Sequence, residues 1–95
     1  MGINPGIIVL RSDRPLEESV FRKISLFCNV REDCVIENIT LPNLYEAPLM
    51  LEKHNFSWIV CRELGINAGP CEMAEWAEMV ERIKARNKCV KIAIV

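Results

Sequence analysis

Two short apolar runs with an amphipathic stretch between them constrain the fold of this 95-residue chain more than any other feature. Residues 7–10 read Ile-Ile-Val-Leu and residues 34–39 read Cys-Val-Ile-Glu-Asn-Ile, and both runs predict short buried strands. Apolar side chains recur at helical spacing between the runs and predict one stripe on a helix: Val20, Ile24, Phe27 and Cys28. The order strand, helix, strand favours a βαβ unit with two parallel strands.

The ends of the first helix are predicted from proline and charge. Arg11 to Pro15 is polar and predicts a turn after the first strand, with Pro15 in the first turn of the helix. Glu17 and Glu18 then stand where the positive end of the helix dipole favours acids. Lys23 lies beside the apolar stripe, so its stem can pack on apolar surface while its ammonium reaches the sheet edge.

The middle of the chain predicts two short helices. The first is expected over 46–53, with Pro48 in its first turn. Asn55 tolerates the left-handed conformation and separates the two. The second helix is expected to be capped by Ser57 and stopped by Gly65.

A third helix and a final strand are predicted after the linker-like stretch 67–70. The helix has acids in its first turns, bases in its last turns and a stripe at helical spacing: Met73, Trp76, Val80 and Ile83. Such a stripe is more often core than a ligand site. Residues 89–95 are nearly all apolar and predict a strand, which would need neighbours on both edges.

Charge and hydropathy exclude several classes of function. Twelve Lys and Arg against thirteen Asp and Glu leave a formal charge of -1, which provides no field to gather nucleic acid or anionic lipid. The longest apolar stretches, 6–10 and 90–95, are far too short to cross a bilayer. We therefore expect a cytoplasmic protein with no nucleic-acid or membrane partner.

The cysteines do not form a metal-binding or catalytic pattern. There is no Cys-x-x-Cys pair, and His54 is the only histidine, so zinc spacing is missing. The five thiols are expected to be reduced and mostly buried as small apolar residues: Cys28, Cys34, Cys61, Cys71 and Cys89. A nucleophile pair of Cys28 and His54 has no local signature to support it.

The basic residues of the first half have an ordinary interpretation. Arg11 and Arg14 can be loop charges that pair with Asp13, and Lys23 can be a solvated helix residue. Considered without any resemblance, this interpretation is the better one for all three.

Three longer motifs argue against this ordinary interpretation. Arg-Ser-Asp-Arg stands at 11–14, Lys-Ile-Ser-Leu-Phe-Cys-Asn-Val at 23–30 and Leu-Tyr-Glu-Ala-Pro-Leu at 44–49. Together with shorter matches around them, these motifs resemble the CTP synthase family at that family's spacing: Gly2-Ile-Asn-Pro5, Ile7 to Leu10, Val35-Ile36 and Glu75-Trp76. The resemblance runs without a gap over most of the chain.

The resemblance implies an α/β fold: part of a three-layer, P-loop-NTPase-like (Rossmann-like) parallel sheet with helices, incomplete because the chain is a fragment. It implies an ATP-dependent, glutamine-hydrolysing C–N ligase, which phosphorylates the uracil carbonyl of UTP and lets ammonia displace the phosphate to give CTP. It also implies Mg as cofactor, ATP as substrate and a homotetramer. The Mg ligands would lie upstream of this segment, and the glutaminase Cys and His downstream.

The same resemblance assigns site residues. Lys23 and Arg11 would contact UTP or CTP, which is consistent with ligands binding outside the carboxyl ends of strands in open α/β sheets. The adenine of ATP would be read mainly by the backbone of Ile39, Thr40 and Leu41. No catalytic residue and no metal ligand is assigned to the chain.

The resemblance also divides the chain. Residues 1–65 would be the C-terminal part of the synthetase domain, 66–88 a linker helix and 89–95 the first strand of the glutamine amidotransferase domain. The glycines do not form a phosphate loop, so the isolated chain is expected to be inactive: Gly2, Gly6, Gly65 and Gly69. Three residues depart from the family: Gly6 replaces a usual Asp, Arg31 a common Pro and Trp58 an acid.

Two other functions stay open at this point. One is a non-catalytic module that keeps the fold for assembly with other subunits. The other is a free-standing small nucleotide-binding domain, which saturable binding of UTP or CTP would reveal.

Overall fold

The two predicted strands pair in parallel, in a computed structural model that describes residues 2–95. β1 (Ile8–Ser12) and β2 (Val35–Ile39) form a two-stranded sheet whose register runs from Ile8 opposite Val35 to Ser12 opposite Ile39. The predicted βαβ unit is confirmed. β1 extends two residues further than expected, because Arg11 and Ser12 continue the pairing into the stretch predicted as a turn.

The crossover helix α1 (Glu18–Cys28) connects the strands. It begins three residues after Pro15, so the prediction of Pro15 in its first turn is wrong. The intervening loop is held to the sheet because the backbone N–H of Leu16 donates to Glu37 Oε1 at 2.6 Å. At the other end, Asn29 adopts the left-handed conformation with φ of 53°, which stops the helix.

The apolar stripe of α1 is only partly covered. Val20 and Ile24 are half-buried, but Phe27 is 89% exposed and Cys28 is exposed as well. A helix is about 10 Å wide and paired strands are about 5 Å apart, so two strands cannot cover the whole stripe. The predicted stripe is present on α1, but its last turn, with Phe27 and Cys28, is not covered.

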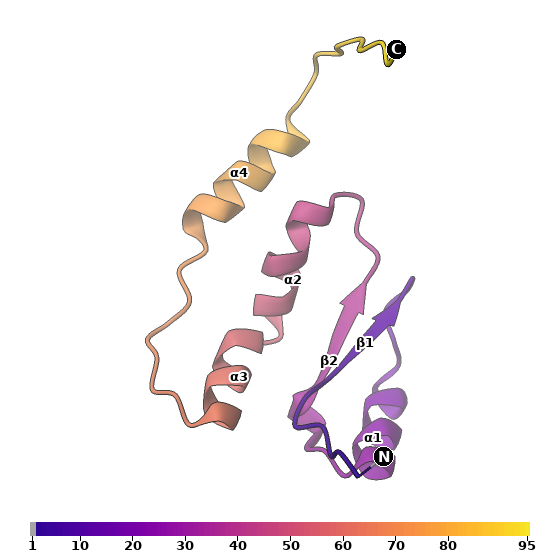
Figure 1. Ribbon diagram of the computed structural model, residues 1–95, viewed down its shortest axis with the longest axis vertical. Coiled ribbons are helices and arrows are strands. Elements are labelled where there is room, and N and C mark those ends of the chain that lie inside the picture. Colours follow the sequence, from indigo (N-terminus) through magenta and orange to yellow (C-terminus); the bar gives the residue numbers. More distant parts are fainter. Residues whose placement is uncertain (1) are drawn as a thin grey trace.

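The core lies between β2 and the helices α2 (Ala47–Lys53) and α3 (Phe56–Leu64). Ile36 of β2 and Ile59 of α3 are buried in one cluster with Val30 and Cys34. In the view of Figure 1, α1 lies on one side of the strands, and α2 and α3 lie on the other. The arrangement is a small piece of an α/β sheet with helices on both sides.

The junction between α2 and α3 agrees in part with the prediction from the sequence. Pro48 lies in the first turn of α2, and Gly65, with φ of 67°, ends α3, both as predicted. Asn55, with φ of 55°, immediately precedes α3. Ser57 does not cap the helix, because its Oγ donates to Glu52 Oε2 at 2.8 Å and its N–H donates to Glu52 Oε1 at 3.1 Å.

The last helix, α4 (Ala74–Lys84), follows a stretch without regular structure at 66–73. Of its predicted stripe, Val80 is buried at 1% exposed, Met73 and Ile83 are half-buried, and Trp76 is 36% exposed. The predicted strand over 89–95 does not form within residues 2–95, because residues 86–95 have no regular structure and the described sheet consists of β1 and β2. Among the helices of residues 2–95, none combines the length and the hydropathy that a membrane span requires.

The burial of the cysteines also differs from expectation. All five are free thiols, but only Cys34 is buried, Cys61 is half-buried and the other three are exposed. Cys28 lies on the uncovered last turn of α1, and Cys71 and Cys89 lie in segments without regular structure. The prediction that most of them fill a core is wrong, because the core of this chain is small.

Candidate functional site

The guanidinium of Arg11 lies at the carboxyl edge of the strand pair and connects both strands. Its Nη1 donates to the carbonyl oxygens of Ser12 at 2.6 Å and Asn38 at 3.3 Å, and its Nη2 donates to Thr40 Oγ1 at 2.9 Å. The backbone N–H of Thr40 donates to the carbonyl of Ser12 at 2.9 Å and continues the ladder beyond β2. Strand pairing thus fixes both the backbone and the side chain of Arg11.

Arg11 is linked to Asp13 only through a threonine. The hydroxyl of Thr40 donates to Asp13 Oδ1 at 2.7 Å, and no direct salt bridge joins Arg11 to Asp13 within residues 2–95. All three side chains are exposed. A guanidinium carries five N–H donors, of which three have protein acceptors here, so the remaining two can be offered to an anionic ligand.

The segment 39–41 lies beside this guanidinium. Ile39 is the last residue of β2 and pairs with Ser12, whereas Leu41 follows the sheet and is half-buried. The N–H and C=O of Leu41 form no hydrogen bond with any residue that the structure describes. This backbone can therefore donate to and accept from a planar ligand such as a base.

Lys23 is not among the residues that hydrogen-bond at that edge within residues 2–95. It lies in the second turn of α1 and is exposed, and its side-chain ammonium makes no hydrogen bond or salt bridge within the described part of the chain. Its neighbour Arg22 is paired with Glu18 at 3.3 Å. Of the predicted site residues, the structure brings together Arg11, Ile39, Thr40 and Leu41, but within residues 2–95 no hydrogen bond or salt bridge joins Lys23 to them.

The loop between β2 and α2 contains a polar atom that the sequence did not single out. Asn43 Oδ1 accepts from the N–H of Tyr45 at 3.1 Å, and its own carbonyl accepts from the N–H of Glu46 at 3.0 Å. The Nδ2 of Asn43 is buried and has no hydrogen-bond partner within residues 2–95. An unpaired buried donor costs about 1–3 kcal/mol, so neighbouring contacts must hold this loop in place.

A second polar cluster lies at the opposite, amino end of β2. Arg62 Nη1 is 2.5 Å from Asp33 Oδ2 and its Nη2 is 3.1 Å from Glu63 Oε1, which Arg31 also contacts. The hydrogen bond from Arg62 lowers the pKa of Asp33, against an opposing effect of burial, and the same bond raises the pKa of Arg62. These contacts attach α3 to the start of β2, and charge spacing along the sequence gave no signal for them.

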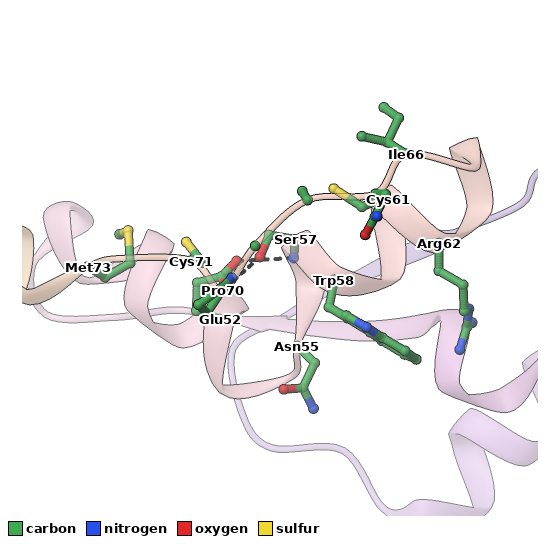
Figure 2. Close-up of a pocket in the computed structure, with 13 residues that line it drawn as sticks. Glu52, Asn55, Ser57, Trp58, Cys61, Arg62, Ile66, Pro70, Cys71 and Met73 are labelled. Carbon is green, nitrogen blue, oxygen red and sulfur yellow. Dashed lines mark hydrogen bonds between the residues drawn. The ribbon is translucent and has the colours of Figure 1, made fainter.

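A groove with a volume of about 950 Å³ lies between α3 and the segment 66–73. Figure 2 shows Trp58 beside Arg62 in this groove, and the guanidinium carbon of Arg62 lies 4.9 Å from the ring centroid. Trp58 remains 60% exposed. None of the predicted site residues lines the groove, so it is separate from the carboxyl edge.

Within residues 2–95, no three His, Cys, Asp or Glu side chains converge on a point where a metal could bind. Cys28 and His54 form no hydrogen bond with each other within that part of the chain.

Comparison with known proteins shows which family this chain resembles. A family model described as CTP synthase N-terminus matches residues 1–66. The chain is 46% identical to a CTP synthase from Pelotomaculum thermopropionicum, 48% to one from Thermococcus gammatolerans and 42% to one from Halalkalibacterium halodurans. Each match covers 100% of this chain but only 18% of the relative's length. The chain belongs to the CTP synthase family.

Proposed function

We propose that this chain is a segment of a glutamine-hydrolysing CTP synthase and forms one wall of its nucleotide sites. In that reaction the γ-phosphoryl group of ATP passes to the carbonyl oxygen of UTP, giving ADP. Ammonia released from glutamine then displaces the phosphate, giving CTP and inorganic phosphate. The 100% coverage of this chain by relatives named CTP synthase supports the proposal, although the chain spans 18% of their length.

The single observation that carries the site assignment is the Arg11–Thr40 contact at the carboxyl ends of two adjacent parallel strands. Ligands of open α/β sheets bind outside this edge. We assign Arg11 to the UTP or CTP site, because its two spare donors can meet phosphate or uracil oxygens. Lys23 is assigned to the same ligand, because its ammonium has no partner within the described residues and can bind a polyanion.

The adenine of ATP is assigned to the backbone of 39–41. Adenine offers a donor and an acceptor side by side, and the N–H and C=O of Leu41 are both free of protein partners within residues 2–95. Side chains then add apolar contact, from Ile39 and Leu41, to the faces of the ring.

The division of the chain is part of the same proposal. Residues 1–65 would be the C-terminal part of the synthetase domain and 66–88 the linker that contains α4. Residues 89–95 would enter the glutamine amidotransferase domain and become a strand only beside neighbours from that domain. The exposure of Ile92 and Ile94, at 83% and 98%, supports the need for such neighbours. Mg ligands, the glutaminase residues, the homotetramer and a cytoplasmic location would belong to the whole enzyme.

A chimera tests the proposal. This chain would replace the matching 95 residues of the Pelotomaculum thermopropionicum enzyme, and CTP formation from UTP, ATP and glutamine would be measured. We expect a rate within about tenfold of the parent, a difference of about 1.4 kcal/mol in the barrier. A folded chimera of the parent's oligomeric state that forms no CTP would contradict the proposal.

A non-catalytic assembly module is the second candidate, and one surface favours it. Leu26 and Phe27 on the last turn of α1 are 76% and 89% exposed, which suits a face that another protein covers. Such a module would restore assembly of the chimera without restoring CTP formation. The two functions are therefore separated by measuring oligomeric state and rate on the same sample.

A further inference from the structure

α4 is attached to the rest of the molecule through the short turn that follows the carboxyl edge. This turn, η2 (Leu44–Glu46), begins three residues after Leu41. The indole Nε1 of Trp76 donates to the carbonyl oxygen of Tyr45 at 2.7 Å, and the two rings lie 6.3 Å apart with planes tilted by 53°. Figure 1 shows α4 beside the start of α2, in the half of the molecule toward which both strands point.

A salt bridge reinforces this contact one residue further along. Lys84 Nζ lies 2.5 Å from Glu46 Oε1, and the side chain of Glu46 is only 16% exposed. The hydrogen bond to Glu46 raises the pKa of Lys84. α4 therefore contacts two consecutive residues of η2, one through its first turn and one through its last.

The loop needs such an attachment. Asn43 leaves a buried donor unpaired while its side-chain oxygen and its carbonyl hold Tyr45 and Glu46. An unpaired buried donor costs about 1–3 kcal/mol, which other contacts of the loop have to offset. Trp76 contacts Tyr45 and Lys84 contacts Glu46, which are the same two residues.

We infer that Trp76 is a positioning residue: by holding η2, it fixes the segment 39–41 in the conformation that receives adenine, so that α4 controls nucleotide affinity. The inference rests on the proposed function for its ligand, but the attachment of η2 by α4 can be measured without any nucleotide. A linker helix bound in this way would transmit its own movements to the ATP site. Detaching α4 would release the loop and weaken ATP binding.

The first arm of the test measures amide hydrogen exchange in the full 95-residue chain. Trp76→Ala removes the ring and the donor, and Trp76→Phe keeps a ring but removes the donor. The amides of Tyr45 and Glu46 are expected to exchange at least about fivefold faster in both variants, the factor for losing one hydrogen bond of about 1 kcal/mol. Trp58→Ala is the matched control, because Trp58 lies on α3, is 60% exposed and contacts Arg62.

The amide of Val30, which donates to the carbonyl of Ser25 at the far end of α1, reports whether a variant has lost its fold. Its exchange should not change in any variant. If Trp76→Ala also accelerates Val30, the Phe variant decides the result. Unchanged exchange at Tyr45 and Glu46 in Trp76→Phe, or equal acceleration by Trp58→Ala, would overturn the inference.

The second arm uses the chimera with the Pelotomaculum thermopropionicum enzyme. Trp76→Phe is expected to raise the ATP concentration for half-maximal rate by about fivefold and that for UTP by less than about twofold. Faster exchange with an unchanged ATP requirement would overturn the link to the nucleotide site. If the unsubstituted chimera makes no CTP, the proposed function fails, and the exchange arm still decides whether α4 holds the loop.

Discussion

Arg11 and Thr40 lie 29 positions apart in the sequence, yet the guanidinium of Arg11 donates to the hydroxyl of Thr40 at 2.9 Å. Parallel pairing of β1 with β2 makes this contact, because it brings the carboxyl ends of both strands to one edge. The same pairing gives Arg11 two further acceptors, the carbonyls of Ser12 and Asn38. A cation held by three contacts is pre-oriented for an anionic ligand, which reduces the entropy lost on binding.

Arg11→Ala in the chimera is expected to raise the UTP concentration for half-maximal rate by about tenfold to a hundredfold, the range for losing a hydrogen bond between charged groups. Steady-state rates at varied UTP concentrations measure this half-maximal concentration. Arg14→Ala is the control, because only the backbone carbonyl of Arg14 takes part in a hydrogen bond within the described residues. An equal effect of both substitutions would remove Arg11 from the proposed site.

Lys23→Ala is expected to raise the same UTP requirement by about threefold to tenfold, because an exposed ammonium binds as a single point charge. Thermal unfolding should not change, since Lys23 has no partner within residues 2–95 whose loss could destabilise the fold. Arg22→Ala is the neighbouring control and removes only an exposed pair with Glu18. An unchanged UTP requirement would place Lys23 outside the site.

The sequence predicted the local elements well because each has a local cause. The apolar runs of β1 and β2, the left-handed Asn55 and the stop at Gly65 all follow from neighbouring residues. The parallel pairing was also predicted from the sequence, because two buried strands connected by a helix favour a parallel sheet. The position of Arg11 at the carboxyl end of the first strand was implied by the family resemblance, whereas the residues alone placed it in a turn.

The sequence could not show what depends on distant partners. Residues 89–95 have the pattern of a strand, but a strand forms only where another offers its backbone. Ser57 looked like a helix cap, but Glu52 takes its hydrogen bonds. The contacts of Trp76 with Tyr45 and of Arg62 with Asp33 join residues about thirty positions apart, and neither pair has a local signature.

The isolated 95-residue chain is expected to form no CTP from ATP, UTP and ammonia. Phosphoryl transfer needs groups that hold the triphosphate and its metal, and the chain spans only 18% of the length of its relatives. Product formation would be measured by chromatography against a sample without protein, with the chimera as positive control. Turnover above the protein-free sample would contradict this expectation.

Acid should weaken the attachment of α3 to β2. Arg62 lowers the pKa of Asp33 below its ordinary value of 3.8, so the charged carboxylate favours the folded state above about pH 5 and loses that contribution as the pH falls through its folded pKa. Asp33→Asn should therefore reduce the melting temperature at pH 7 slightly and flatten its decline below about pH 5. The control is Glu32→Gln, since Glu32 forms no salt bridge within residues 2–95. Parallel pH profiles for Asp33→Asn and the unchanged chain would contradict the assignment.

The fold of the isolated chain depends on very few buried side chains, and Ile36 is central among them. It is 2% exposed and lies in one cluster with Ile59 of α3, so Ile36→Ala removes packing between the sheet and the helices. The expected loss in the free energy of unfolding is about 2–5 kcal/mol, against about 5–14 kcal/mol for a domain of this length. Ile92→Ala, at a residue 83% exposed, should change it by less than about 0.5 kcal/mol. Urea unfolding followed by circular dichroism measures both, and equal losses would show that this cluster does not stabilise the chain.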